Sequence, residues 1–415
     1  MNPKRKILVP IFNRAHYGRL RPVLDAIKNH PALDLKIIVG VPAAYGYFFK
    51  NIAHSRPRSW VAAGPWYVLA RLRSWAGQDY VFRNDFLAQN LIKDGFEIES
   101  YAPIFFDGGK SETMAKTVGL GVERLVEEIK KIKPDIVFVN ADRFEMLAVA
   151  IAASYLNVPI AHNEGGDVSG TIDESIRHAI TKLAHIHFTS TESSRRRVIQ
   201  MGEDPGKVFA VGSPAIDAVA KIDFTIPPRV FPGLNVNQPY ILVLVHPVAT
   251  DSQEGNIKLV TNLILALKEL PWPKVILGSN IDAGSDVLGS AVRNWLENEK
   301  PQDVFFTKHL HPDDFYKYLK NTACAVGNSS SFIREGAYFG TPVVLAGLRQ
   351  NKREKGENVL EVEGNADSLK KAMAFQISHG QYPKSDMFGW GNTASNMASI
   401  LATVDLDIQK SFNDL

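Results

Sequence analysis

Short apolar runs alternate with longer stretches of helical spacing along most of this chain. In the longer stretches, apolar positions recur every three or four residues, which predicts helices such as Leu20–Lys28, Glu145–Leu156 and Ile172–Leu183. The short runs predict strands, and in the first half of the chain they are residues 6–12, 35–41, 135–141, 158–163, 185–190 and 207–213. Strands and helices that alternate in this way form a parallel sheet covered by helices.

The alternation pauses at residues 223–239, DFTIPPRVFPGLNVNQP, where proline and asparagine are frequent. Such a stretch is typical of a linker. Strand-like runs then resume at residues 240–247, 274–280, 303–308, 324–328 and 342–347. Two successive series of this kind predict an α/β protein of two Rossmann-like domains that face a cleft. We expect a first domain over 1–218, a linker over 219–238 and a second domain over 239–395.

A segment over residues 55–85, rich in Trp, Arg and Tyr, interrupts the rhythm of the first domain. One interpretation is an amphipathic helical insertion that packs on the domain or at a subunit contact. The other is a helix that lies on a membrane surface. Its apolar stretch is too short to span a bilayer and contains Gly64-Pro65, so we expect no stable membrane insertion.

The composition narrows the class of protein. The length of 415 residues favours two domains, and 45% hydrophobic with 22% charged residues is typical of a soluble globular enzyme. A net charge of +3 gives no bias towards nucleic acid or lipid. The single cysteine, Cys324, excludes intrachain disulfides and fits a reducing compartment, so we expect a cytoplasmic protein. The start, MNPKRKILVPIF, predicts a first strand rather than a signal peptide.

An acidic segment lies where a predicted strand passes into a helix. Within residues 161–181 it carries Glu164, Asp167, Asp173 and Glu174 beside a Gly-Gly turn, with Arg177 and His178 behind them. Ligands of open α/β sheets bind at the carboxyl ends of strands. Neighbouring carboxylates push their pKa values apart, so Glu164 and Asp173 can serve as general base and acid. Alternatively, Asp173 caps a helix that begins near Glu174, and the two roles are compatible.

Two further candidates follow strands. Asp142 and Arg143 directly follow the run DIVFVNA. They are either functional residues at the carboxyl end of this strand or partners in a structural ion pair. His246 follows the first strand of the second domain, and Pro247 stops that strand. A lone histidine is more often structural than catalytic. His246 gains weight because it occupies the position in the second domain that the acids occupy in the first.

The run GNSSSFIREGAYFGTPVV, residues 327–344, has the features of an anion site. A Gly-Asn turn and three serines open a helix, whose N–H groups and hydroxyls suit phosphates; plain helix capping is the alternative. Glu335, one turn on, can accept both hydroxyls of a ribose, and Arg349 and Arg14 can place guanidinium groups near a pyrophosphate. The run lacks the Walker pattern, and no GxGxxG follows the first strand, which argues against nicotinamide binding. The pairs His185/His187 and His309/His311 have no acid or cysteine at ligand spacing, so we expect no metal.

These motifs, in this order, resemble the UDP-N-acetylglucosamine 2-epimerase family. The matching runs are FNRAHYGRLRP, ADRFEMLAVAIA, HNEGGDVSGTIDESIRH, HPVATD, GNSSSFIREGAYFGTPVV and RQNKREKGENVL, and they extend over most of the chain. The form GGDVSGTIDESIRH is similar to the UDP-hydrolysing branch, which feeds synthesis of sialic-acid-type sugars for surface polysaccharides. The resemblance implies a glycosyltransferase-B-like pair of domains, with residues 396–415 returning to the first domain.

The resemblance also implies a reaction that needs no cofactor. The C2 proton is removed and UDP eliminated to give a 2-acetamidoglycal, and water then adds at C1 with reprotonation at the other face of C2. By matching position, Asp142, Glu164, Asp173 and His246 are the catalytic residues. On the sugar side the matching residues are Arg143, Glu174, Arg177 and His16. For UDP they are Arg14, His309, Ser329, Ser330, Glu335 and Arg349.

Three departures from the family pattern lie on the sugar side. A G-x-H-L motif is replaced by Gly40-Val41-Pro42-Ala43, an acidic residue in the first loop is replaced by His16, and the 55–85 segment is long. We therefore expect the nucleotide to be UDP and the sugar to differ from plain GlcNAc, for example a 4-amino or 6-deoxy HexNAc. The released product is then ManNAc or the corresponding modified analogue. The alternatives are a non-hydrolysing epimerase and a UDP-sugar-dependent glycosyltransferase. We expect a homo-oligomer, dimer or tetramer, and no nucleic-acid partner.

Overall fold

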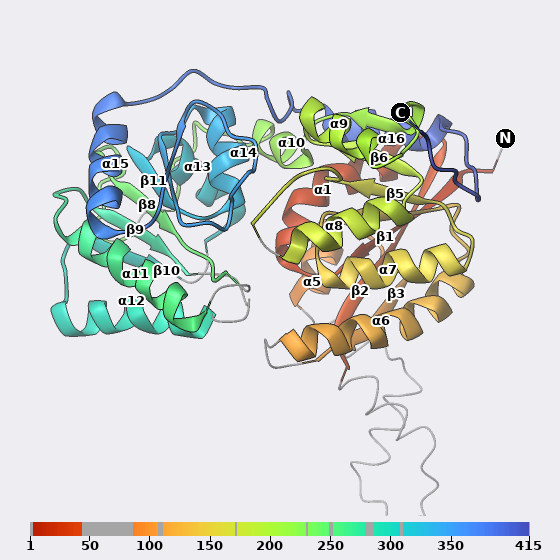
Figure 1. Cartoon of the computed structure of the whole chain (residues 1–415), viewed down its shortest axis with the longest axis horizontal. Coiled ribbons are helices and arrows are strands. Elements are labelled where there is room, and N and C mark those ends of the chain that lie inside the picture. Colours follow the sequence, from red (N-terminus) through yellow and green to blue (C-terminus); the bar gives the residue numbers. More distant parts are fainter. Residues whose placement is uncertain are drawn as a thin grey trace, which may run out of the picture. The chain divides into compact units, whose positions relative to one another are not determined.

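The computed structural model describes residues 3–43, 86–106, 111–170, 172–229, 231–248, 252–278, 285–307 and 310–414 (Figure 1). The predicted insertion over 55–85 and the candidate His309 lie outside these ranges. The chain divides into two compact units. Unit 1 comprises Met1–Asn163, Ala179–His187 and Ala398–Phe412, and unit 2 comprises Glu164–His178, Phe188–Met397 and Asn413–Leu415. The domain boundaries drawn from the sequence remain predictions.

The first sheet has the strand order β3-β2-β1-β4-β5-β6-β7. Its strands are β1 (Arg5–Ile11), β2 (Leu33–Pro42), β3 (Ser100–Phe105), β4 (Ile136–Asn140), β5 (Ile160–Asn163), β6 (Ile186–Thr189) and β7 (Val208–Ala210). β1 pairs in parallel with both β2 and β4, so the direction of strand succession reverses between β1 and β4. The loops after these two strands therefore flank the switch point, where α/β sheets bind ligands.

Helices connect these strands. They are α1 (Arg14–Asn29), α5 (Phe86–Lys93), α6 (Ser111–Ile132), α7 (Phe144–Tyr155), α8 (Ile172–Leu183), α9 (Glu192–Gln200), the 3-10 turn η1 (Pro205–Lys207), α10 (Pro214–Ala220) and, near the end of the chain, α16 (Thr393–Thr403). Within unit 1, Arg5 Nη1 donates to the carbonyl oxygens of Leu401 and Val404 at 2.7 and 2.9 Å. The last part of α16 is thereby tied to the first strand of the chain.

The second sheet has the order β10-β9-β8-β11-β12-β13, and all its pairs are parallel. Its strands are β8 (Ile241–Leu244), β9 (Lys274–Leu277), β10 (Val304–Thr307), β11 (Cys324–Gly327), β12 (Val343–Ala346) and β13 (Val359–Val362). Its helices are α11 (Gln253–Lys268), α12 (Ser285–Glu299), α13 (Pro312–Asn321), α14 (Ser330–Phe339) and α15 (Ala366–His379). The predicted fold class, two parallel-sheet α/β domains, is confirmed.

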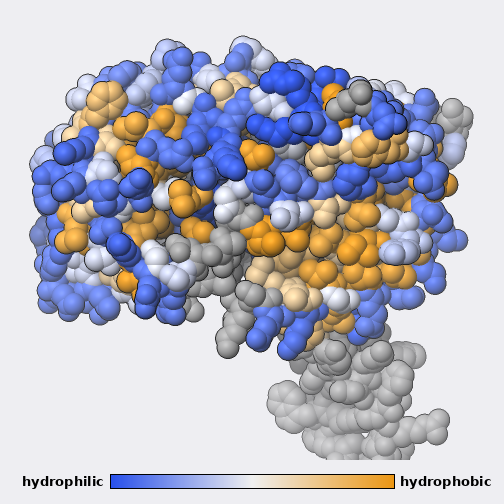
Figure 2. Space-filling view, in the orientation of Figure 1, coloured by the Kyte–Doolittle hydropathy of each residue, from blue (hydrophilic) through white to orange (hydrophobic). Residues whose placement is uncertain are grey.

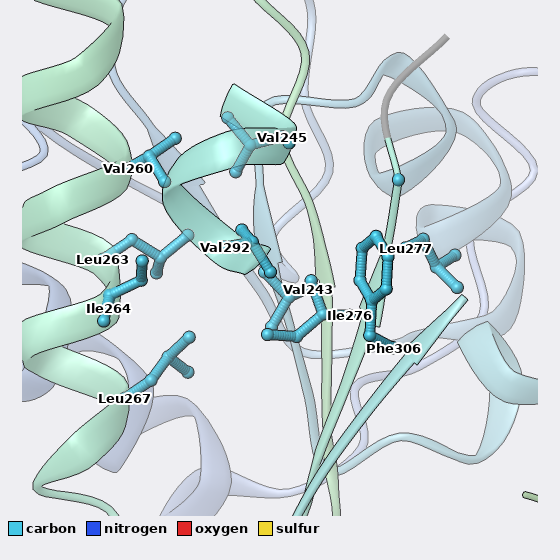
Figure 3. Close-up of a pocket in the computed structure, with 12 residues that line it drawn as sticks. Val243, Val245, Val260, Leu263, Ile264, Leu267, Ile276, Leu277, Val292 and Phe306 are labelled. Atoms are coloured by element: carbon cyan, nitrogen blue, oxygen red, sulfur yellow. The ribbon is translucent and has the colours of Figure 1, made fainter. Parts of the chain in front are cut away.

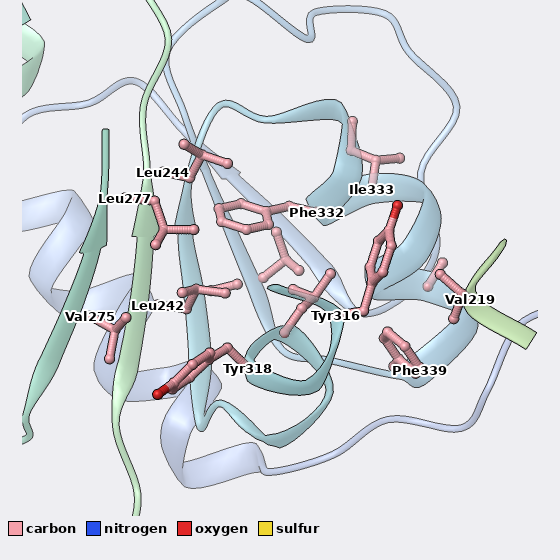
Figure 4. Close-up of a cluster of buried hydrophobic side chains, with 14 of the residues drawn as sticks. Val219, Leu242, Leu244, Val275, Leu277, Tyr316, Tyr318, Phe332, Ile333 and Phe339 are labelled. Carbon is pink, nitrogen blue, oxygen red and sulfur yellow. The ribbon is translucent and has the colours of Figure 1, made fainter. Parts of the chain in front are cut away.

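Two core clusters cover the two faces of the second sheet. On one face Leu242 and Leu244 pack with Phe332 and Ile333 of α14 (Figure 4). On the other face Ile241 and its neighbours pack against α11 and α15. Burial on both faces explains why these strands read as continuous apolar runs. The packing also fixes α14 against β8.

The helices of unit 1 leave an apolar surface. α6 and α7 pack against each other, and Figure 2 shows hydrophobic residues gathered over them. Leu147 and Ile151 of α7 are partly exposed, and Tyr155 is 86% exposed. A contiguous apolar surface of this kind is typical of an interaction face.

An apolar pocket lies in the second domain between α11 and the strands β8, β9 and β10. Figure 3 shows Leu263 and Leu267 of α11 opposite Val243, Ile276 and Phe306. None of the described residues that line this pocket is ionisable. Those residues offer no group for acid–base chemistry, and the candidate chemistry lies at the strand ends.

Candidate active site

The acidic segment leaves β5 through a tight turn within unit 2. Glu164 has φ 64°, a left-handed conformation that is costly for a side-chain-bearing residue and is found where the surroundings impose it. Its N–H donates to Phe188 O at 2.9 Å. Gly166 has φ 75°, and a Cβ there would lie 2.2 Å from Ser194 O, so only glycine fits. The turn thus holds Glu164 in one direction.

Glu164 is buried in a two-point ion pair with Arg334 of α14. Arg334 donates through Nη1 to Oε1 at 2.6 Å and through Nη2 to Oε2 at 2.9 Å. The two residues are 3% and 2% exposed. Burial alone would lower the pKa of Arg334, but the charges of Glu164 and Asp167 outweigh it and raise that pKa. Arg334 therefore stays cationic.

Asp167 is the second buried carboxylate of this cluster. It accepts a bond of 2.8 Å from Ser194 Oγ and lies 3.5 Å from Arg334 Nη2 and 3.8 Å from Arg353 Nη2. Burial raises the pKa of Asp167, and the two guanidinium groups partly oppose that rise. Arg177, fully buried, donates to the backbone oxygen of Asp167 at 2.8 Å. Burial, together with the charges of Arg353 and Arg334, lowers the pKa of Arg177.

The acids of α8 lie in its first turn. The helix begins at Ile172, so Asp173 lies inside it rather than at the capping position that the alternative gave it. Glu174 Oε2 accepts the N–H of Ser169 at 2.5 Å, and its Oε1 lies 3.8 Å from His178 Nε2. Burial and the charge of Arg177 lower the pKa of His178.

The predicted residues of unit 1 follow β4 and β1. Asp142 is partly exposed after the left-handed Ala141, whose φ is 60°. Arg143 donates through Nε to Glu145 Oε1 at 3.2 Å and forms an ion pair with it. In the first loop, His16 is 4% exposed and its N–H donates to the side chain of Asn13 at 2.8 Å. Arg14 opens α1, and its side chain is not among those described.

The loop after β8 is clamped by Asn328. The N–H of His246 donates to Asn328 Oδ1 at 2.7 Å, and Asn328 Nδ2 donates to His246 O at 2.8 Å. Arg349 Nη1 and Gln350 Nε2 both donate to the backbone oxygen of Asn328, at 3.1 and 3.0 Å. His246 is 7% exposed. Asn328 therefore ties the candidate histidine to the loop that carries Arg349.

The serine-rich run opens α14 as predicted. Ser329 is the N-cap residue and accepts the N–H of Ser331 at 3.4 Å, and Ser330 is the first helical residue. Capping and phosphate binding are compatible, since the hydroxyls and N–H groups of Ser329 and Ser330 converge at one helix end. Glu335 is 1% exposed and accepts a bond of 3.3 Å from Tyr316 OH.

The described ranges offer no group of three His, Cys, Asp or Glu side chains that could hold a metal ion. His311 accepts the N–H of Asp313 at the start of α13 and so has a structural role. Cys324 is fully buried, which raises the pKa of its thiol. As far as the helices are described, none combines the length and apolar character of a membrane span.

The structure brings together Glu164, Asp167 and Arg177 with two arginines that the sequence did not single out. Arg334 precedes the candidate Glu335, and Arg353 lies in the charged run NKREK. The feature of the sequence that could have indicated Arg334 is its position, since it is a charged residue directly after the apolar pair Phe332-Ile333 in a short helix. Asn328 was likewise missed, although it stands between the glycine and the serines of the predicted anion site.

Comparisons with known proteins show the family to which the chain is similar. The family model for UDP-N-acetylglucosamine 2-epimerase matches residues 77–402. The chain is 31% identical over 411 residues to the UDP-N,N'-diacetylbacillosamine 2-epimerase (hydrolyzing) of Legionella pneumophila, covering 98% of this chain and 97% of that relative. It is 27% identical over 366 residues to the GDP/UDP-N,N'-diacetylbacillosamine 2-epimerase (hydrolyzing) of Campylobacter jejuni, covering 87% and 85%.

Among solved structures, the chain is similar to the UDP-GlcNAc 2-epimerase from Neisseria meningitidis bound to UDP-GlcNAc. The TM-score is 0.73 at 18% identity, over 95% of this chain and 99% of that chain. At this identity the likeness shows the fold alone.

Proposed function

The chain belongs to the UDP-N-acetylglucosamine 2-epimerase family, and on that premise we propose that it is a hydrolysing UDP-HexNAc 2-epimerase. Its substrates are a UDP-HexNAc and water, and its products are UDP and a free manno-configured N-acetylamino sugar. Loss of the C2 proton with departure of UDP gives the 2-acetamidoglycal. Water then adds at C1 while C2 takes a proton on the opposite face, so C2 is inverted.

The observation that carries the proposal is the position of α14. This helix presents Ser329 and Ser330 at its N-terminus and carries Glu335, and its Arg334 binds Glu164 of the acidic segment. Groups suited to a nucleoside diphosphate are thus connected directly to a carboxylate suited to proton transfer. Elimination of UDP needs both, because a base must take the proton while cations and N–H groups stabilise the departing diphosphate.

The proposal assigns proton transfer at C2 to Asp142, Glu164, Asp173 and His246. Arg143, Glu174, Arg177 and His16 serve the sugar side. The nucleotide is held by Arg14, His309, Ser329, Ser330, Glu335 and Arg349. Two chemically different proton-transfer groups are required because the proton leaves one face of C2 and arrives at the other.

We further propose that the sugar is a modified HexNAc. Two observations support this proposal: the departures at Gly40–Ala43 and His16, and the sugar in the names of two relatives, N,N'-diacetylbacillosamine, which carries two acetylated amino groups. Kinetics with UDP-GlcNAc and UDP-N,N'-diacetylbacillosamine test it. Turnover of UDP-GlcNAc as fast as that of the modified donor contradicts the sugar assignment and leaves the epimerase assignment intact.

Location and assembly are part of the proposal. A cytoplasmic location is supported by the single, buried Cys324. A homo-oligomer is supported by the apolar surface over α6 and α7. Light scattering coupled to size-exclusion chromatography tests the assembly, and a mass of one chain, 45.9 kDa, contradicts it.

A further inference from the structure

We propose that Arg334 is a positioning residue for Glu164, which it holds in place and couples to the nucleotide end of α14. The inference rests on the proposed function and deepens it, since that function assigns Glu164 to proton transfer and the first turn of α14 to UDP.

The geometry of the pair demands an arginine. Two N–H groups of one guanidinium bind two oxygens of one carboxylate, at 2.6 and 2.9 Å, in a site where both side chains are almost fully buried. This fork fixes the plane of the carboxylate as well as its position, and a lysine ammonium cannot reproduce it. The left-handed backbone of Glu164 and the tight packing of Gly166 fix the other end of the side chain.

The position of Arg334 on α14 supplies the coupling. Arg334 follows Ser330 by about one helical turn and directly precedes Glu335. Phe332 and Ile333 lie between Ser330 and Arg334 in the sequence and are fully buried against the second sheet (Figure 4). A rigid helix segment therefore joins the candidate diphosphate and ribose groups to the acid. A displacement of Arg334 would therefore also displace the Glu164 carboxylate.

The neighbouring charges support a positioning role. Asp167 lies 3.5 Å from Arg334 and is also held by Ser194 and Arg353. Asp167 thus contacts the same guanidinium group that binds Glu164, and Arg334 in turn orients Glu164. Both terminal nitrogens of the guanidinium contact protein carboxylates, so we expect Arg334 to act on the reaction through Glu164.

The test compares the variants R334M, R334K, E164Q and R334M/E164Q with the wild type. We expect R334M to lower kcat by about 100-fold, the loss that follows a displacement of a reacting group by about 1 Å. UDP affinity, measured by calorimetry, should stay within about threefold, since the nucleotide contacts are elsewhere on α14. R334K should recover part of kcat because it keeps the charge and one contact. Because R334M removes the cation beside Glu164, the acid limb of its kcat–pH profile should move to higher pH. R334K keeps the cation and should leave that limb at the pH of the wild type.

The double variant separates positioning from a direct role. If Arg334 acts through Glu164, R334M/E164Q loses no more kcat than E164Q alone. Additive losses, or a loss of UDP affinity equal to the loss of kcat, would overturn the inference. The matched control is K274M, because Lys274 is 3% exposed and pairs with Asp303 in the same unit without entering the site. K274M should lower thermal stability and leave kcat and its pH profile unchanged.

Two further outcomes are decisive. If R334M does not fold, R334K and E164Q still test the role, and an R334K enzyme with the kcat of the wild type contradicts it. Turnover of the wild type is measured first with UDP-GlcNAc and with UDP-N,N'-diacetylbacillosamine. A wild type that releases no UDP contradicts the proposed function, whereas an active wild type with an unaffected R334K contradicts only the positioning role.

Discussion

The clamp on the His246 loop gives a prediction whose size follows from the structure. The side chain of Asn328 is 1% exposed and makes two bonds to the backbone of His246, accepting at 2.7 Å and donating at 2.8 Å. Asn328→Ala removes both bonds and leaves a buried N–H and a buried C=O without these partners. Each buried backbone group that loses its partner costs about 1–3 kcal/mol. We therefore expect the free energy of unfolding of the unit that contains Asn328 to fall by about 3–4 kcal/mol.

Urea unfolding followed by tryptophan fluorescence measures this loss through the midpoint and slope of the transition. The matched control is N235A, because Asn235 accepts a similar backbone bond, from Asn237 at 3.0 Å, in an exposed loop of the same unit. A surface change of this kind stays within about 0.5 kcal/mol. N328D keeps the acceptor and loses the donor, so its stability should lie between the wild type and N328A. An N328A variant as stable as N235A would refute the reasoning.

The other predictions concern α8 and the buried thiol. Asp173→Asn should abolish exchange at C2, followed by NMR in deuterated water, and leave UDP affinity within a few-fold; an equal loss of UDP binding would make Asp173 structural. The folded-state pKa of His178 is lowered by burial and by Arg177, so its contribution to stability is present above pH 6.5 and is lost as the pH falls from there through the folded-state pKa. Thermal melts between pH 7.5 and 5.5 should therefore show a smaller decline for H178Q than for the wild type, and parallel curves would contradict this. Cys324 should react with a chromogenic disulfide reagent only after unfolding, because burial raises the pKa of its thiol; rapid reaction of the native protein would disprove its burial.

The fold could be predicted because strands buried on both faces appear as continuous apolar runs. The helix expected over Ile172–Leu183 has those bounds in the structure. The strands that sequence analysis missed, β3 and β13, are both sheet edges. β3 contains Pro103 and alternates between buried and partly exposed positions, and β13 carries Glu361 within a partly exposed run. Edge strands lack the apolar continuity of central ones, so the pattern is weaker there.

The candidate site could be predicted in part for a different reason. Parallel strands place their carboxyl ends along one edge, so Asp142 and Glu164 were found from strand ends alone. Arg334 pairs with a residue 170 positions away in the chain, and only the packing of α14 brings the two together. The same holds for Asn328 and His246, which are 82 positions apart. A single sequence gives no signal for such pairs, and a charged residue on a helix usually indicates an exposed face.

The central claim is hydrolytic epimerisation of a UDP-HexNAc at C2. Proton NMR of the wild type with UDP-N,N'-diacetylbacillosamine and UDP-GlcNAc in deuterated water tests it most directly. The account predicts free UDP and a reducing, manno-configured sugar that carries deuterium at C2. An intact UDP-sugar with deuterium at C2 would indicate a non-hydrolysing epimerase. Release of UDP only with an added acceptor, and without deuterium at C2, would indicate a glycosyltransferase and contradict the account.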